Sequence, residues 1–267
     1  MSESPEVSPA METVQAAGVT RLLSIMARLR DRDAGCEWDI AQTFATIAPY
    51  TIEEAYEVAD AIDRDDLPAL REELGDLLLQ VVFHARMAEE LGAFDFDAVA
   101  HAISDKMTER HPHIFGDAAD QGQSREVRWE AQKAAERAAK GATSALDGVA
   151  LALPALMRAE KLQKRAARVG FDWPDTEGPR AKVIEELDEL AAARTENERL
   201  DEAGDLLFAA VNLVRRYGVA PEDALRHGNA KFERRFRAME ALAGSDFPAL
   251  SLEAQEELWQ RVKAAER

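Results

Sequence analysis

The sequence contains a single cysteine, Cys36, which excludes an intramolecular disulfide and a cysteine-rich zinc site. Glycine (14) and proline (10) are scarce among the 267 residues, which is unusual for a sheet-rich fold with many tight turns. No apolar run approaches the roughly 18 residues of a membrane span. The acidic N-terminal segment lacks the basic start and apolar middle of a signal peptide. These absences predict a soluble protein of a reducing compartment, the cytoplasm.

Positive charge is also in short supply. Lys and Arg number 33 against 51 Asp and Glu, which gives a formal net charge of −18. Nucleic acid and anionic membrane both require clustered positive charge, so the balance argues against either as the main partner. Small anionic substrates remain compatible with this negative net charge where metal ions mediate their binding.

Helical periodicity runs through most of the sequence, and no alternating strand pattern is found. Apolar residues at the three-and-four spacing predict helices over residues 19–29, 51–64, 67–91 and 97–110. Thr51 resembles an N-cap and Gly92 a C-cap. The expected fold class is therefore all-α.

Two polar stretches, residues 116–124 and 134–147, divide the chain into halves. We predict a disordered acidic tail over residues 1–17 and a first helical module over residues 18–115. A linker over residues 116–146 and a second helical module over residues 147–267 complete the expected organisation.

The two halves repeat one pattern of acidic residues. IEEAYEVADAI, which begins at Ile52, corresponds to IEELDEL from Ile184, and EELGDLL from Glu72 corresponds to DEAGDLL from Asp201. A doubled acid followed three positions later by another acid should arise by chance about twice in such a composition. It occurs four times, always within the repeat. The halves are therefore interpreted as copies of one helical module.

Carboxylates three or four residues apart share a helix face, so each module can gather its acids in one pocket. In the second half Glu186 and Glu189 project together, and Glu202 and Asp205 do so on the next helix. An all-oxygen set without histidine or thiolate suits a hard cation such as Mg²⁺ or Mn²⁺. A solvated acidic helix face is the alternative. The matching residues of the first half are Glu54, Glu57, Glu73 and Asp76.

Basic residues distinguish the two halves. Lys182 lies one turn before Glu185, where the first half has Tyr50. Lys231 and Arg235 share a later helix face, for which an ordinary surface helix is the alternative. Lys and Arg side chains beside a carboxylate-bound metal ion are suited to binding a polyphosphate. The metal ion neutralises part of the negative charge of the polyphosphate, and the basic side chains neutralise the rest.

Several longer motifs resemble one known family, the MazG nucleoside triphosphate pyrophosphohydrolases. The motifs are GCEWD at residues 35–39, QTFATIAPYTIEEAYEV at 42–58, ELGDLL at 73–78, RHPHIF at 110–115, LALPALM at 151–157 and KFERRF at 231–236. The similarity covers roughly residues 19–265. It implies two repeated helical-bundle modules of the all-α NTP pyrophosphatase type, Mg²⁺ as cofactor (with Mn²⁺ as an option) and a homodimer.

The resemblance also implies roles for individual residues, with the second module as the catalytic one. The metal ligands would be Glu186, Glu189, Glu202 and Asp205. The implied contacts of the triphosphate are Lys182, Lys231 and Arg235, with Asn229 nearby. The first module keeps all its acidic positions, so its inactivity is not implied.

The chemistry expected from these residues is metal-assisted attack of water at the α-phosphorus of a nucleoside triphosphate, with pyrophosphate leaving. Glu185 is the expected acceptor of the water's proton, and Lys182 the expected catalytic cation. A dUTPase or a phosphoribosyl-ATP pyrophosphohydrolase of the same superfold would share this chemistry. A non-enzymatic acidic helical interaction module is the third alternative. A di-iron bundle is disfavoured because no histidine follows an acid by three positions.

Overall fold

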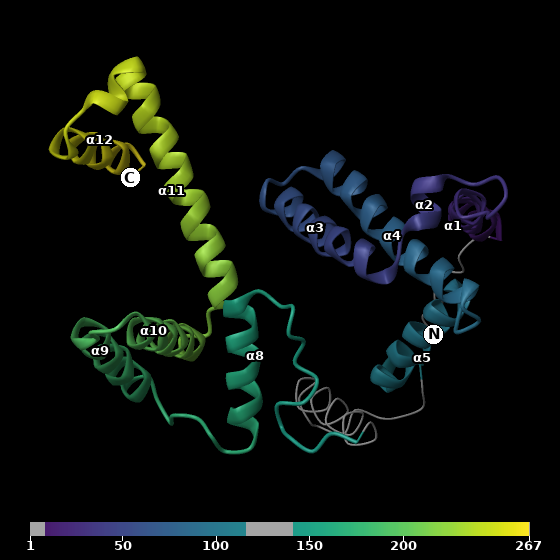
Figure 1. Ribbon diagram of the computed structural model, residues 1–267, viewed down its shortest axis with the longest axis horizontal. Helices are drawn as coiled ribbons and strands as arrows, with labels where there is room; N and C mark the ends of the chain where they lie inside the picture. The colour runs from purple at the N-terminus through teal and green to yellow at the C-terminus, as the bar shows by residue number, and fades with distance from the viewer. Residues whose placement is uncertain (1–8, 116–140, 267) are drawn as a thin grey trace, which may run out of the picture. The chain divides into compact units, whose positions relative to one another are not determined.

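The computed structural model of the protein describes residues 9–115 and 141–266, and the regular secondary structure in those ranges is entirely helical (Figure 1). The all-α prediction is confirmed. The chain divides into two compact units, residues 1–125 and 126–267. Most of the predicted linker lies outside the described residues, so its bounds stay a prediction. Within the described ranges, none of the helices combines the length and the apolar character that a membrane span requires.

The first unit contains a long helical hairpin with shorter helices packed around it. Its helices are α1 (Pro9–Leu29), α2 (Glu37–Ala41), α3 (Phe44–Asp63), α4 (Leu67–Glu90), α5 (Phe96–Arg110) and α6 (Pro112–Phe115). The hairpin of α3 and α4 makes the most extensive helix–helix contact of the unit, and α1 and α5 both pack on α4. The helices predicted over residues 67–91 and 97–110 correspond to α4 and α5.

Two helix starts differ from their predictions. α3 begins at Phe44 and not at Thr51, because Thr43 and Thr46 form a capping box in which each side chain bonds the other residue's backbone N–H. Pro49 lies inside this helix, so the proline does not mark its start. α1 begins at Pro9, so it overlaps the predicted tail over residues 9–17, while residues 1–8 lie outside the described ranges.

A small apolar core and one ion pair fix the first hairpin against α1. Met26, Ile47, Val82, Phe83 and Met87 form a buried cluster. At the end of α1, Arg30 is 8% exposed and pairs with Glu90 of α4 at 2.7 Å. The guanidinium holds the pKa of the Glu90 carboxyl below its ordinary value. This contact and the cluster hold α4 at a fixed position against α1.

The second unit repeats the hairpin and adds a C-terminal helical arm. Its elements are α8 (Ala155–Arg168), α9 (Glu177–Ala192), α10 (Glu196–Arg216), α11 (Pro221–Ala243), the 3₁₀ helix η1 (Gly244–Ala249) and α12 (Leu252–Ala265). α9 and α10 pair as α3 and α4 do, and α8 packs on α10. α10 starts at the N-cap Thr195, whose side chain and that of Glu198 form a second capping box.

The C-terminal arm has its own core. Met239, Phe247, Leu258 and Val262 form a buried cluster between α11, η1 and α12. α11 contacts α8 and α10 near its beginning and then runs away from the α9–α10 hairpin within the second unit (Figure 1). The residues in the second half of α11 therefore pack against the arm and not against the hairpin.

Candidate functional site

The α9–α10 hairpin brings three acidic side chains together. Glu186 of α9 and Glu202 and Asp205 of α10 each offer a carboxylate oxygen, and these oxygens lie within 4.8 Å of one another. The spacing of Glu202 and Asp205, three apart on one helix, directs both towards α9. The predicted acidic pocket of the second module is therefore present in the structure.

Glu186 is the buried member of the pocket. The residue is 2% exposed, and its Oε1 atom lies 2.6 Å from the ammonium nitrogen of Lys182. Its Oε2 atom is buried and has no hydrogen-bond partner. A buried carboxylate oxygen without a partner is energetically costly, so this atom marks the place where a cation would be stabilising.

Glu202 and Glu189 complete the acidic surroundings. Burial raises the pKa of Glu202 first, and the charges of Glu189, Glu186 and Asp205 raise it further. Glu189 is thus close enough to act on Glu202, although it is not among the three carboxylates that converge within 4.8 Å. Four carboxylates that repel one another in this way favour a bound cation.

Lys182 is held by the acids of its own helix. Its ammonium nitrogen lies 2.9 Å from Glu185 Oε1 and 2.6 Å from Glu186 Oε1. The hydrogen bond with Glu186, followed by that with Glu185, raises the pKa of Lys182 above its ordinary value, so the side chain carries a full positive charge at neutral pH. Lys182 was predicted to contact a triphosphate. In the structure its ammonium group is paired with the carboxylates of Glu185 and Glu186.

The three other predicted substrate residues lie on α11. Arg235 pairs with Glu266 of the C-terminal arm at 2.7 Å and lies over the ring of Trp259, 5.5 Å from its centroid. Among the described residues, no hydrogen bond or ion pair joins Asn229, Lys231 or Arg235 to the acidic pocket. Their contact with a triphosphate stays a prediction.

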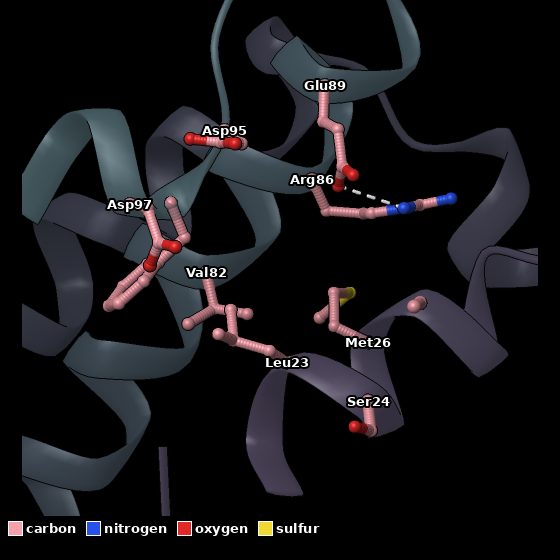
Figure 2. A pocket seen from close by; sticks show the side chains of 10 residues that line it. Leu23, Ser24, Met26, Val82, Arg86, Glu89, Asp95 and Asp97 are labelled. Carbon is pink, nitrogen blue, oxygen red and sulfur yellow. Dashed lines mark hydrogen bonds and ion pairs between the residues drawn. The ribbon is translucent and has the colours of Figure 1, made fainter. Parts of the chain in front are cut away.

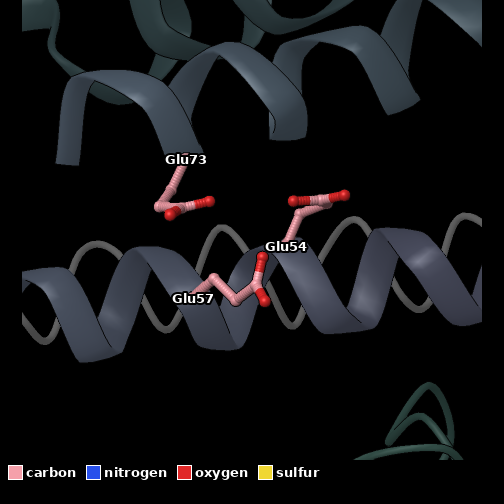
Figure 3. A group of neighbouring side chains, drawn as sticks. All are labelled: Glu54, Glu57 and Glu73. Carbon is pink, nitrogen blue, oxygen red and sulfur yellow. The ribbon is translucent and has the colours of Figure 1, made fainter. Parts of the chain in front are cut away.

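The first unit carries a matching acidic group. Glu54 and Glu57 of α3 and Glu73 of α4 point towards one another, with carboxylate oxygens within 4.8 Å (Figure 3). Burial raises the pKa of both Glu54 and Glu73, and the charge of Asp76 is the next cause for Glu54. Three of the four predicted acids of this half therefore converge; Asp76 is not in the group, whereas its counterpart Asp205 is in the group of the second half.

The first unit also has a cavity of about 320 Å³ between α1, α4 and the start of α5 (Figure 2). Two of its acidic side chains already have structural partners. Glu89 pairs with Arg86 at 2.9 Å, and Asp95 accepts a hydrogen bond from the Ala98 backbone at the start of α5. Since the three converging glutamates do not line this cavity, it is not part of the acidic site.

The second unit has a cavity that sequence analysis missed. It measures about 520 Å³ and is lined by α8, the segment before α9, and the middle of α10. Gln163, Trp173, Phe208 and Asn212 contribute to its walls. The only sequence signal was the difference between the halves at one aligned position, where Asn212 replaces the buried Phe83.

Comparison with known proteins gives the same division into two similar halves. Residues 42–115 match the MazG nucleotide pyrophosphohydrolase domain, and residues 158–231 match the phosphoribosyl-ATP pyrophosphohydrolase family.

Whole-length relatives are also found. The chain is 54% identical over 258 residues to "Nucleoside triphosphate pyrophosphohydrolase" of Escherichia coli strain K12, which covers 93% of this chain and 98% of that protein. It is 44% identical over 248 residues to "Nucleoside triphosphate pyrophosphohydrolase/pyrophosphatase MazG" of Thermotoga maritima, covering 92% of this chain and 95% of that protein. A protein of Mycobacterium tuberculosis is 38% identical over 153 residues, covering 57% of this chain and 46% of that protein.

Proposed function

The chain belongs to the MazG family of nucleotide pyrophosphohydrolases, and we propose that its second module hydrolyses nucleoside triphosphates to the monophosphate and pyrophosphate. The names of the whole-length relatives support this substrate class. The observation that carries the proposal is the buried carboxylate of Glu186, which has an unpartnered Oε2 atom and two further carboxylates within 4.8 Å. That arrangement suits a cation-assisted reaction of an anionic substrate.

Mg²⁺ is the proposed cofactor, and Mn²⁺ would fit the same ligands. The donor set is entirely carboxylate oxygen, which hard divalent cations prefer. Glu186, Glu202 and Asp205 would hold the ion, with Glu189 beside them. Such an ion supplies charge neutralisation at phosphate oxygens and lowers the pKa of a bound water.

Lys182 and Glu185 supply the remaining groups in the proposal. Cation binding at Glu186 competes with the ammonium of Lys182 for the same carboxylate, and this leaves Lys182 available to a phosphate oxygen. Glu185 is more exposed than Glu186, and it would accept the proton of the attacking water on a carboxylate oxygen. The water oxygen bonds to the α-phosphorus, the bond from that phosphorus to the bridging oxygen breaks, and pyrophosphate leaves.

The second module is proposed as the catalytic one because the first module has no lysine at the position of Lys182. Tyr50 stands in the first half where Lys182 stands in the second. A phenol offers a neutral hydrogen bond, which is roughly half as strong as a charge-assisted one. The acidic group of the first module remains a proposed second metal site.

A phosphoribosyl-ATP pyrophosphohydrolase is the second candidate, because residues 158–231 match that family. It would use the same carboxylates on a different substrate. Incubation with Mg²⁺ and a panel of canonical nucleoside triphosphates, dUTP and phosphoribosyl-ATP, followed by chromatography of the products, separates the candidates. Turnover of phosphoribosyl-ATP or dUTP alone would replace the broader proposal, and no turnover of any substrate would favour a non-enzymatic role.

A cytoplasmic homodimer is the proposed state of the protein, without nucleic-acid or membrane partners. The net charge of −18 supports the absence of polyanionic partners. Large apolar side chains on both hairpins remain exposed, and such surfaces favour association. They include Ile52, Tyr56, Leu74, Ile184, Leu187 and Leu207. Light scattering coupled to size-exclusion chromatography tests the dimer, and a monomer at micromolar concentration would refute it.

A further inference from the structure

The second module holds a positive charge of its own against the carboxylate that is proposed to bind the metal. The ammonium nitrogen of Lys182 lies 2.6 Å from Glu186 Oε1 and 2.9 Å from Glu185 Oε1. The Lys182 side chain is 42% exposed, whereas that of Glu186 is 3% exposed. The lysine therefore reaches from the surface to a buried carboxylate, and it is a counter-ion that the chain itself supplies.

This ammonium leaves most of the acidic pocket without a positive partner. The second oxygen of the buried carboxylate, Glu186 Oε2, has no hydrogen-bond partner. Carboxylate oxygens of Glu202 and Asp205 lie with one of Glu186 in a group within 4.8 Å, and within the described ranges neither of these two residues forms an ion pair. One ammonium thus faces several carboxylates, and the pocket keeps its attraction for a divalent cation.

The first module gathers its acids without such a counter-ion. Tyr50 occupies the position of Lys182. Glu54, the counterpart of Glu186, accepts a long hydrogen bond of 3.5 Å from the neutral amide of Gln80. In the part of the chain that the structure describes, no basic side chain pairs with the acidic group of this module. The lysine is therefore not required to bring the carboxylates together, and its place in the second module calls for another reason.

A divalent cation and the ammonium compete for Glu186. Both are attracted to the same carboxylate, and at such short range their like charges repel each other. A cation that binds alone must therefore disrupt the two short charge-assisted hydrogen bonds of Lys182. Among the described residues the ammonium has no partner other than Glu185 and Glu186, so its displacement gains no new protein contact. The displacement opposes metal binding.

A polyphosphate removes this opposition. Its oxygens accept hydrogen bonds from an ammonium and also coordinate a hard cation. The displaced ammonium then exchanges a carboxylate for a phosphate oxygen, and the anion between the ammonium and the metal ion reduces their repulsion. Two ligands that favour each other's binding in this way are coupled, and the coupling is equal in both directions.

We propose that Lys182 is an internal competitor of the metal, which weakens binding of the divalent cation alone and couples it to binding of the triphosphate. This inference rests on the proposed function, because it takes the acidic pocket as the metal site and a triphosphate as the substrate. The second module then loads its metal together with the substrate.

Binding of Mn²⁺ alone to the full chain measures the competition, with the electron paramagnetic resonance signal of the free ion as the readout. The parent protein for these titrations carries Glu54→Gln and Glu73→Gln, which remove two carboxylates from the acidic group of the first module. In this parent Lys182→Met should lower the Mn²⁺ dissociation constant about tenfold, the equivalent of one charge-assisted hydrogen bond. Lys182→Gln should do the same, because it keeps a hydrogen-bond donor but not the charge. Lys182→Arg keeps the charge and should bind Mn²⁺ as the parent does.

Arg180→Met is the matched control. It removes one positive charge from the same helix, but the ion pair of Arg180 is with Glu177 at 3.7 Å. Its Mn²⁺ dissociation constant should stay within about twofold of the parent's, because solvent and salt screen exposed charges. Circular dichroism establishes that each variant is folded. Metal-free Lys182→Met should melt below the parent, because Glu186 loses its ammonium partner, and Mg²⁺ should raise its melting temperature by more.

The substrate side is measured with α,β-methylene-ATP, in which a CH₂ group replaces the bridging oxygen between the α- and β-phosphates. Isothermal titration calorimetry at saturating Mg²⁺ should show about tenfold weaker binding of this analogue to Lys182→Met than to the parent. The same substitution thus tightens binding of the metal alone and weakens binding of the metal–nucleotide complex. A lysine with only a structural role would weaken both, and one that only contacts phosphate would leave Mn²⁺ binding unchanged.

The outcomes separate this inference from the proposed function. If Lys182→Met binds Mn²⁺ no more tightly than the parent, or if Arg180→Met or Lys182→Arg tightens binding equally, the competition is wrong. Hydrolysis of ATP to AMP and pyrophosphate by the unmodified chain would then still support the proposed reaction. If the two binding constants move in opposite directions but ATP is not hydrolysed, the coupling stands and the proposed reaction fails. Absence of Mn²⁺ binding in every variant would refute the inference together with the metal site.

Discussion

Glu186→Gln changes the acidic pocket by one charge and almost no volume. Without metal we expect the melting temperature to change little. The amide nitrogen can donate to the neighbouring carboxylates, and Lys182 keeps its contact with Glu185 at 2.9 Å. With metal the two proteins should differ, because the variant loses the buried carboxylate whose Oε2 atom has no partner.

The size of the difference follows from mass action. A ligand at 100 times its Kd that binds only the folded state adds about 2.7 kcal/mol to the free energy of unfolding. If the substitution weakens binding of the ion about 30-fold, the same concentration adds only about 0.9 kcal/mol. For a unit of this size 1 kcal/mol corresponds to roughly 2–4 °C. The Mg²⁺-induced shift should therefore fall from about 5–10 °C to about 2–3 °C.

Differential scanning calorimetry with MgCl₂, against NaCl of equal ionic strength, measures this shift. Glu54→Gln is the matched control, since it makes the same substitution in the acidic group of the first module. It should leave the Mg²⁺-dependent stability of the second unit unchanged. The same Mg²⁺-induced shift in Glu186→Gln and wild type would refute the assignment of Glu186 as a ligand.

Three further predictions concern other parts of the molecule. Lys182→Ala should lower kcat/KM for ATP by one or two orders of magnitude in steady-state assays, whereas Glu54→Gln keeps most of the activity; the reverse result would place the active site in the first module. Glu90→Gln should lower the free energy of unfolding at pH 7 by about 1.5–3 kcal/mol, measured with urea. The folded state depresses the pKa of Glu90 from its ordinary 4.5, so this difference should shrink as the pH falls below 4.5, and a difference that persists at pH 2 would contradict the cause. Gly178→Ala should displace the ring of Trp173, and an unchanged tryptophan emission spectrum would count against the close packing.

The helical hairpins were predictable because the residue spacings that specify them lie close together in the sequence. Acids three or four apart define one helix face, and the repeat shows where the second face must lie. Glu186, Glu189, Glu202 and Asp205 were predicted to converge; three of them do so within 4.8 Å, and Glu189 is not in that group. The start of α3 was not predictable from the same signals. Thr51 precedes two glutamates as an N-cap would, but the capping box of Thr43 and Thr46 lies one turn before a proline that the helix tolerates.

The surroundings of the acidic pocket depend on tertiary structure, which spacing does not reveal. Gln163 and Asn212 come from different helices, and neither has a pattern around it that indicates a site. Arg235 was predicted to contact the substrate because it shares a helix face with Lys231 and because the family resemblance implies it, whereas the structure pairs it with Glu266. The position of Lys182 relative to Glu185 was predicted from one helical turn, but its present partners are the carboxylates and not a phosphate.

The proposed reaction is attack of water on the α-phosphorus of a nucleoside triphosphate in the second module. Hydrolysis of ATP with Mg²⁺ in ¹⁸O-labelled water, followed by mass spectrometry of the products, tests it most directly. We expect one ¹⁸O atom in AMP and none in the pyrophosphate released, with the signal lost in Glu186→Gln. Label in pyrophosphate, or formation of ADP and labelled orthophosphate, would contradict it.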